Sequence, residues 1–483
     1  MKNKKKTIIL LLTMALTLFS SVVFSSPAVS EANSAPRETK GYDSSGVIVK
    51  TENSPIVVDK EDLTFHIYSA DRFIPVQEYV RRGIVTAEYT FRNPTNLIVE
   101  TRCLFPFGFV PYDESQTEAD KEYFKVKTNG KDLDKTIRHT YKADPFAKFD
   151  LEEDLRYFSD DFIADDTLST DLTVYEYVLD VKGANGKLPT YVMFSDNVKN
   201  LKYIVADNYV KYEKNGDITE LVAWQDGLKN EQLTLAFVGE DVTDIESKFS
   251  FFDDKWKSVG GSVVKGKKVE YNFKDYALKF RPAGSDVSDV DWYNATIALI
   301  KSRTSTVFQK WEHSLSTCLF RWYDYTLTFA PEETLVNTVS APLYPSATRN
   351  YVPPVYSYTY LLSPAAGWAD FNNLTIRIYT DMYLLRGETR KSVTNPDGSV
   401  NITGETVDFT KNGGIYEARF EKLPDGDLTL FICASEKPER YKPPLGKVTK
   451  IIITLSTGIG LIVIATIILV VTVKKQKTKG KKR

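Results

Sequence analysis

The chain has 483 residues, of which 42% are hydrophobic and 26% are charged, and its formal net charge is −2. Lysine and arginine gather at the two ends, so the long region between them is acidic, which argues against nucleic acid or an anionic membrane surface as a ligand held by charge. The 3 cysteines, Cys103, Cys318 and Cys433, are too few and too widely spaced to predict a disulfide framework or a zinc site. The sequence leaves two alternatives: one long-range disulfide bridge, or three buried free thiols.

Apolar stretches near both ends predict export and membrane anchoring. Residues 1–30 have a basic start, an apolar core from Thr7 to Phe24 and small residues after it, as in a cleaved signal peptide. Residues 451–473 carry no charge or proline and would span roughly 34 Å as a helix, against a hydrocarbon core of about 30 Å. The basic residues of 474–483 predict a cytoplasmic tail. We therefore expect a single-pass, type I protein of the cell membrane, with its N-terminal ectodomain outside.

Strand patterns dominate the first half of the ectodomain. After a flexible leader at 31–54, we predict a β-rich domain at 55–284, because short β-branched and aromatic runs alternate with turn residues. Asn129-Gly130 suits a two-residue hairpin turn, and Gly266 is interpreted as the break between two strands. An acidic segment with aromatic residues at helical spacing, 149–162, predicts a short helical insertion.

A central helix at 285–318 separates this domain from a second β-rich one. Asp286 or Ser288 can cap the helix, and apolar residues follow at helical spacing. The strand pattern of 319–437 is typical of an immunoglobulin-like sandwich, and prolines in 438–450 indicate a short stalk. The predicted fold class is mainly β: two β-sandwich-like (immunoglobulin-like) units, a central α-helix and one C-terminal transmembrane helix.

One stretch of 20 or so residues resembles a known domain family. Tyr89 to Gly108 reads YTFRNPTNLIVETRCLFPFG, with a strand ending in Asn, a second strand carrying an acid and a closing aromatic-Pro motif. It resembles the start of a vault/inter-alpha-trypsin (VIT) domain. That family often precedes a von Willebrand A domain with a DxSxS metal site, and no such motif is present in this sequence. A metal-dependent adhesion site is therefore not expected.

A second resemblance covers part of the C-terminal half. The stretches Tyr323–Thr334, Leu361–Phe371 and Leu374–Ile378 resemble the C-terminal sandwich of bacterial exported, membrane-anchored proteins that carry a domain of unknown function. This resemblance implies a fold and brings no activity with it.

Motifs of catalysis and cofactor binding are missing from the sequence. It contains no phosphate-binding glycine loop, no HExxH and no G-x-S-x-G, so no catalytic residue, metal or cofactor is predicted, and the chain is interpreted as not an enzyme. Acids do cluster between Asp150 and Asp171. They fit a solvated helix face, a Ca²⁺ site or the carboxylate pair of a glycan hydrolase, and these alternatives stay open.

Three tyrosines at alternate positions provide the candidate ligand-binding residues. Tyr356, Tyr358 and Tyr360 would lie on one face of a strand, where their rings could stack on sugars or pack beneath another layer. We therefore predict a bacterial cell-surface protein with a non-catalytic extracellular module that binds a cell-wall glycan or a protein partner, and no nucleic acid. The alternative is an extracellular glycan hydrolase that uses carboxylates.

Overall fold

The structure is a computed structural model that describes residues 38–39, 49–50, 54–68, 83–109, 123–142, 151–184, 188–206, 209–215, 218–224, 232–303, 307–308, 315–316, 318–343, 345–394 and 400–441. The predicted signal peptide, membrane-spanning segment and basic tail lie outside these residues, as do most of the leader and the stalk. In the described part of the chain, no helix combines the length and the apolar character that crossing a bilayer requires.

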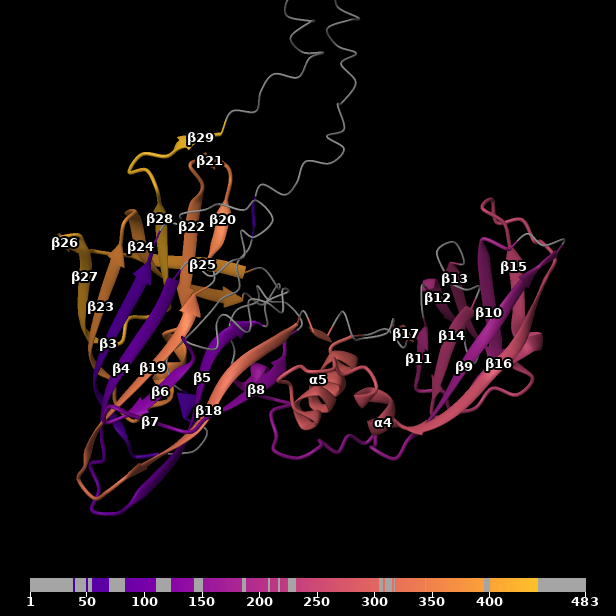
Figure 1. The fold of residues 1–483 in the computed structure, drawn as a ribbon, viewed down its shortest axis with the longest axis horizontal. Coiled ribbons are helices and arrows are strands. Elements are labelled where there is room, and N and C mark those ends of the chain that lie inside the picture. Colours follow the sequence, from indigo (N-terminus) through magenta and orange to yellow (C-terminus); the bar gives the residue numbers. More distant parts are fainter. Residues whose placement is uncertain are drawn as a thin grey trace, which may run out of the picture.

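The chain is mainly β, and its sheet with the most strands combines strands from both halves of the sequence (Figure 1). This sheet has eight strands in the order β26-β27-β23-β3-β4-β19-β6-β7. β3 runs in parallel with β23, and β4 pairs antiparallel with β19. The bounds are β3 Val57–Ile67, β4 Gly83–Arg92, β6 Lys125–Thr128, β7 Lys131–Asp132, β19 Thr334–Leu343, β23 Asn372–Thr380, β26 Thr410–Asn412 and β27 Ile415–Lys422.

Two further sheets share one hydrophobic core with the eight-stranded sheet, and we call these three sheets the large body. Their strand orders are β1-β20-β22-β28-β24-β25 and β2-β5-β18-β8. The bounds are β1 Glu38–Thr39, β2 Val49–Lys50, β5 Val99–Phe109, β8 Thr136–Tyr141, β18 Leu319–Phe329, β20 Ser346–Thr348, β22 Val355–Tyr360, β24 Tyr383–Thr394, β25 Val400–Val407 and β28 Asp427–Cys433. A short pair, β21 Tyr351–Val352 and β29 Glu439–Arg440, extends one end.

The strands between residues 173 and 272, together with the short strand at 307–308, form a second unit, which we call the middle unit. Its sheets have the orders β12-β13-β10-β15 and β16-β9-β14-β11-β17, and residues of both sheets make up one core. The bounds are β9 Thr173–Gly183, β10 Tyr191–Asn197, β11 Tyr203–Ala206, β12 Tyr209–Asn215, β13 Ile218–Trp224, β14 Gln232–Val238, β15 Phe249–Phe252, β16 Gly261–Asn272 and β17 Val307–Phe308.

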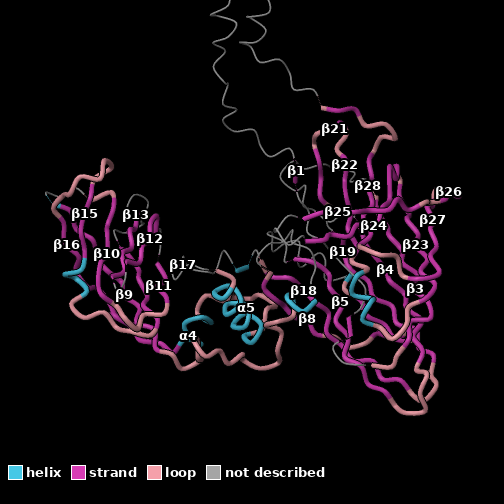
Figure 2. The backbone as a smooth tube through the Cα atoms, turned by 180° about the vertical axis from the view of Figure 1, so that it is seen from behind, coloured by secondary structure: helices cyan, strands magenta, loops and turns pink. Residues whose placement is uncertain are grey.

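Helices lie between the two β units (Figure 2). The short helices are α3, Leu151–Asp154, and α4, Phe273–Leu278, and the longest is α5, Asp289–Lys301. The predicted cap of α5 is confirmed, since the Ser288 hydroxyl accepts a hydrogen bond from the backbone N–H of Asp291 at 3.0 Å.

The central helix is shorter than the predicted range 285–318. It ends at Lys301, and Val307–Phe308 pairs in parallel with β11. The sequence between them, SRTST at 302–306, is rich in serine and threonine, whose side chains compete with the helical backbone for hydrogen bonds. A continuing apolar pattern beyond residue 301 therefore did not indicate a continuing helix.

The chain also divides differently from the predicted domains 55–284 and 319–437. Strands β3, β4 and β5 lie in sheets with β18, β19 and β23 and share their core, while the strands of residues 173–272 form a unit of their own. Alternation of apolar residues identifies a strand and its buried face, but it does not identify the partner strand, which for β3, β4 and β5 lies more than 200 residues away.

Of two glycines that were predicted to separate strands, Gly130 lies in a turn and Gly266 lies within a strand. Asn129 and Gly130 have φ values of 50° and 77° and join β6 to β7 in a two-residue hairpin, as predicted. Gly266 does not separate two strands: β16 is continuous, and the pairing register with β9 shifts between Lys265 and Lys267. Gly266 is the unpaired residue of this bulge, which bends the strand without ending it.

Candidate ligand-binding surface

The structure places the predicted ligand-binding tyrosines in the core of the large body. Tyr356, Tyr358 and Tyr360 of β22 do share one face, but that face is turned inward and all three side chains are buried. Stacking on a sugar requires an exposed ring face, so the prediction of a ligand platform on β22 is corrected: these rings pack against the other sheets.

Tyr360 belongs to a buried polar group that includes an acid. Its hydroxyl donates a hydrogen bond to Oε1 of Glu61 at 3.2 Å and lies 3.1 Å from the hydroxyl of Tyr89. Glu61 is fully buried, and its Oε2 has no hydrogen-bond partner among the described residues. Burial raises the pKa of Glu61 from 4.5 to about 8, although the two tyrosine hydroxyls act to lower it. Glu61 is therefore an uncharged core residue at neutral pH.

Three acids of the segment 150–171, Asp154, Asp160 and Asp165, are engaged in ion pairs with a lysine or an arginine. Lys142 Nζ lies 2.7 Å from Asp154 Oδ2, and Lys301 Nζ lies 2.9 Å from Asp165 Oδ2. Arg102 donates two hydrogen bonds of 2.8 Å to the carboxylate of Asp160. These bonds from Arg102, with one from Arg138, lower the pKa of Asp160 to about 2. A glycosidase's general acid needs a raised pKa, and Asp160 has the opposite.

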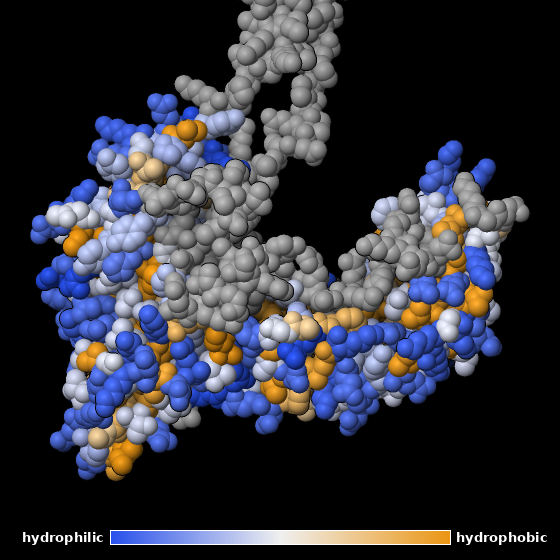
Figure 3. Space-filling model, viewed as in Figure 1, coloured by the Kyte–Doolittle hydropathy of each residue, from blue (hydrophilic) through white to orange (hydrophobic). Residues whose placement is uncertain are grey.

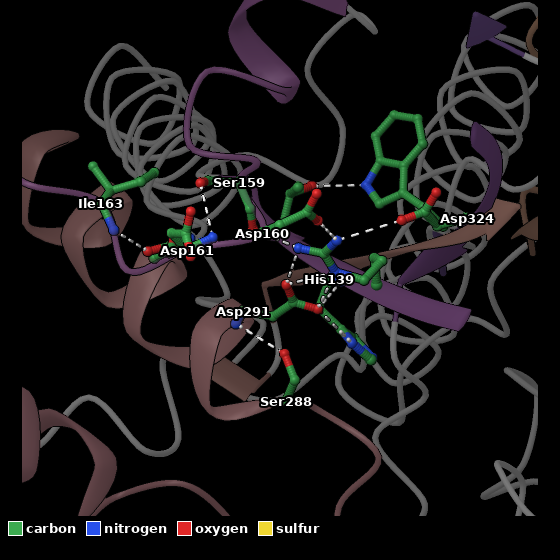
Figure 4. A network of polar contacts seen from close by, with 12 residues as sticks. His139, Ser159, Asp160, Asp161, Ile163, Ser288, Asp291 and Asp324 are labelled. Carbon is green, nitrogen blue, oxygen red and sulfur yellow. Dashed lines mark hydrogen bonds and ion pairs between the residues drawn. The ribbon is translucent and has the colours of Figure 1, made fainter. Parts of the chain in front are cut away.

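Arg138 of β8 is the centre of a polar network that connects α5 to the large body and includes Asp160, Asp291 and Asp324, which Figure 4 labels. Its Nε donates to Asp291 Oδ1 at 2.9 Å, and its Nη1 donates to Asp160 Oδ1 at 2.6 Å. Asp324 of β18 lies 3.4 Å from the same Nη1. Burial acts to raise the pKa of Asp291, but hydrogen bonds from His139 and Arg138 outweigh it, and the net shift is downward. The network keeps the buried charges paired. We call this connection between α5 and the large body the joint.

A partly exposed group of aromatic side chains lies on the outer face of the middle unit. Tyr191 of β10 is directly opposite Trp224 of β13 on one side and Phe252 of β15 on the other. Directly paired residues of neighbouring strands point to the same face. The adjacent residues Val192, Ala223 and Phe251 are in the core, so Tyr191, Trp224 and Phe252 face outward. Trp224 is 43% exposed.

Trp256 completes this group from a neighbouring turn. Its ring stacks on Tyr191, with centroids 4.4 Å apart and planes 9° from parallel, and it lies 5.9 Å from the ring of Phe252. It is 49% exposed. We call Tyr191, Trp224, Phe252 and Trp256 the aromatic platform.

The turn that carries Trp256 is built around Asp253. The Asp253 carboxylate accepts hydrogen bonds of 2.9 Å from the backbone N–H groups of Lys255 and Lys257. Trp256 itself has a φ of 60°, which is unusual for a large side chain and costs about 1–3 kcal/mol. Backbone strain of this kind often accompanies function. Here the strained turn holds the half-exposed ring of Trp256 flat on the ring of Tyr191.

Charged groups of both signs border the aromatic platform. Asp254, Lys255 and Lys257 of the turn are exposed, and they offer acceptors and donors beside the rings. In the described residues, no three His, Cys, Asp or Glu side chains lie together so that they could hold a metal ion. The arrangement suits a ligand with an apolar face and hydroxyl groups at its edge.

Reasoning from the sequence missed Trp224 and Trp256. A usable signal was present for Trp256, which stands alone in the charged run DDKWK at 253–257, where a buried aromatic residue is not expected. No comparable signal marks Trp224, because a tryptophan at the end of a strand is ordinary in a core.

Comparison with known proteins finds no family and a distant structural similarity. No family model matches the chain, and no curated protein matches it. Among solved structures it is similar to a crystal structure of a "putative nutrient binding protein" from Legionella pneumophila, at 12% sequence identity and a TM-score of 0.29, with 82% of this chain and 72% of that chain covered.

Proposed function

We propose that the chain is a bacterial cell-surface protein that binds carbohydrate through the aromatic platform and catalyses no reaction. In this proposal residues 451–473 span the membrane once, and the β units lie outside the cell, where a wall glycan is the available ligand. The sandwich-like character of the β units belongs to the same proposal, supported by the two sheets of the middle unit that share one core.

The observation that carries the proposal is the half-exposed Trp256 stacked on the partly buried Tyr191, with the exposed Trp224 directly opposite Tyr191 on the neighbouring strand. Large exposed rings are costly to leave in water, and a strained turn holds one of them in place. Aromatic rings are flat and amphipathic, and they lose little conformational freedom on binding, so a preformed platform favours a flat ligand face.

The absence of catalysis is supported by the acids of the segment 150–171. Asp154, Asp160 and Asp165 each lie in an ion pair with a lysine or an arginine. The pKa values of Asp160 and Asp165 are lowered, so both carboxylates stay ionised and neither is suited to donate a proton to a leaving group. Among residues 151–171, which the structure describes, no contact favours the hydrolase alternative.

Replacement of Trp224 by alanine, or of Trp256 by glycine, is expected to weaken glycan binding by tenfold or more, since removal of an aromatic anchor from a binding surface commonly costs about 2 kcal/mol. Glycine at 256 accepts the φ of 60° without strain, so the turn keeps its shape and only the ring is lost. Binding of the purified full chain to a glycan array and to isolated cell wall measures the effect.

The matched control is Tyr68→Ala, because Tyr68 is an aromatic residue of the large body with 50% exposure, outside the aromatic platform. This variant should bind as the native protein does. Equal loss in the Tyr68 and Trp224 variants, or unchanged binding in the Trp224 and Trp256 variants, would refute the platform as the binding site.

A further inference from the structure

Both outer ends of the described chain meet at one end of the large body. Glu38 and Thr39 of β1 pair with Thr348 and Ala347 of β20. At the other end of the sequence, Glu439 and Arg440 of β29 pair with β21. The backbone N–H of Tyr441 also donates to the carbonyl of Asn350 at 2.7 Å. The segments that lead toward the two apolar stretches of the sequence thus leave from the same place, the β20–β21–β29 end.

This end carries exposed apolar and aromatic side chains. Val352 is 55% exposed, Tyr351 before it is 39% exposed, and Tyr441, which follows β29, is 37% exposed. Figure 3 shows a small hydrophobic area at this end, near β29, with hydrophilic side chains around it. Tyrosine is enriched where proteins meet the headgroup layer of a membrane, because its ring is apolar and its hydroxyl is polar.

The charge at this end is mixed, which determines the kind of contact. Lys437 and Arg440 are exposed, and so are Glu436 and Glu439. Attraction to anionic lipid therefore contributes little, in keeping with the acidic ectodomain. Burial of the valine and tyrosine side chains is the favourable term that remains.

The length of the connecting segment limits how far this end can lie from the bilayer. Tyr441 is separated from Ile451, the first residue of the apolar stretch, by a segment that can reach about 35 Å at most when fully extended. The loop with Leu97 and Ile98 lies beside the start of β19, since Glu332 N–H donates to Thr95 at 2.9 Å, whereas β20 follows the end of β19. A strand of that length spans roughly 30 Å.

We propose that the β20–β21–β29 end rests on the bilayer surface, with Tyr351, Val352 and Tyr441 in the headgroup layer. The proposal depends on the membrane anchoring of the proposed function and goes beyond it, because it fixes which face of the ectodomain is turned to the membrane. The Leu97–Ile98 loop then points away from the membrane.

The test uses the full chain in nanodiscs of zwitterionic lipid, with an environment-sensitive fluorophore on Val352→Cys and a headgroup-level nitroxide lipid as quencher. Cys103 and Cys433 are buried, and the partly exposed Cys318 is changed to serine so that only the new thiol reacts. The matched control is Ile98→Cys, an exposed aliphatic position, 70% accessible, at the opposite end of β19. We expect the label at 352 to be quenched at least threefold more than the label at 98.

Equal quenching at both positions, stronger quenching at 98, or a chain that does not incorporate into nanodiscs would overturn the proposal. Glycan binding measured on the same samples separates this outcome from failure of the aromatic platform. A chain that binds glycan without quenching at 352 retains the binding function and loses only the proposed orientation.

Discussion

Replacement of Glu61 by glutamine is expected to remove a large pH dependence from the stability of the large body. Because burial raises the pKa of Glu61 from 4.5 to about 8, the folded state keeps the proton between these pH values while the unfolded state loses it. The stability that this proton provides is complete below pH 4.5 and is lost as the pH rises through 8. The pKa difference corresponds to at most about 5 kcal/mol.

Urea unfolding of the native protein and of Glu61→Gln between pH 5 and 9 measures this effect. Glutamine resembles the protonated acid, and its carbonyl can still accept the hydrogen bond from Tyr360. The native stability should fall by several kcal/mol over this range, and that of the variant should stay nearly flat. Glu88→Gln on the exposed face of the neighbouring strand β4 is the control and should keep the native slope. Parallel curves for Glu61→Gln and the native protein would contradict the account.

Replacement of Arg138 by methionine is expected to loosen the joint between α5 and the large body by about 3–5 kcal/mol, because it leaves the buried carboxylate of Asp291 without its partner. Hydrogen exchange of the α5 amides in the full chain measures the local opening. The pKa of Asp291 is lowered in the native protein, so the native contact is weakened only at acid pH. In the variant the defect should shrink as the pH falls, since protonation removes the unpaired charge.

A second change identifies the cause. Arg138→Met with Asp291→Asn should recover at least half of the loss, because asparagine is uncharged and still accepts the hydrogen bond from the backbone N–H of His139. Arg92→Met is the matched control: Arg92 pairs with Asp59 at 2.8 Å on the surface, where such pairs contribute about 1 kcal/mol or less. If the α5 amides of Arg138→Met exchange as slowly as those of the native protein, the network does not stabilise the joint. The same conclusion follows if the double variant exchanges as fast as Arg138→Met.

Local features of the fold could be read from the sequence, and long-range pairing could not. Ser288 as a helix cap and Asn129-Gly130 as a hairpin turn depend on a few neighbouring residues, and both were predicted. The parallel pairing of β3 with β23 depends on strands that are more than 300 residues apart. No local pattern specifies it, because the apolar faces of many strands in this chain are interchangeable.

The tyrosines of β22 illustrate the limit for the functional site. Their spacing correctly predicts one shared face, but an inward and an outward face have the same spacing, and the structure places Tyr358 and Tyr360 in the core. The aromatic platform combines residues of β10, β13, β15 and a turn. Its members meet only through strand register, which the sequence alone does not provide.

The most direct test of the carbohydrate-binding proposal is radical footprinting of the full chain with and without a bound cell-wall oligosaccharide. The account predicts that the ligand protects Trp224 and Trp256 from modification at least several-fold, while Tyr68 is modified equally in both samples. Protection of Tyr68 in their place, unchanged modification of both tryptophans at saturating ligand, or the absence of any oligosaccharide that binds would contradict the aromatic platform as the site of function.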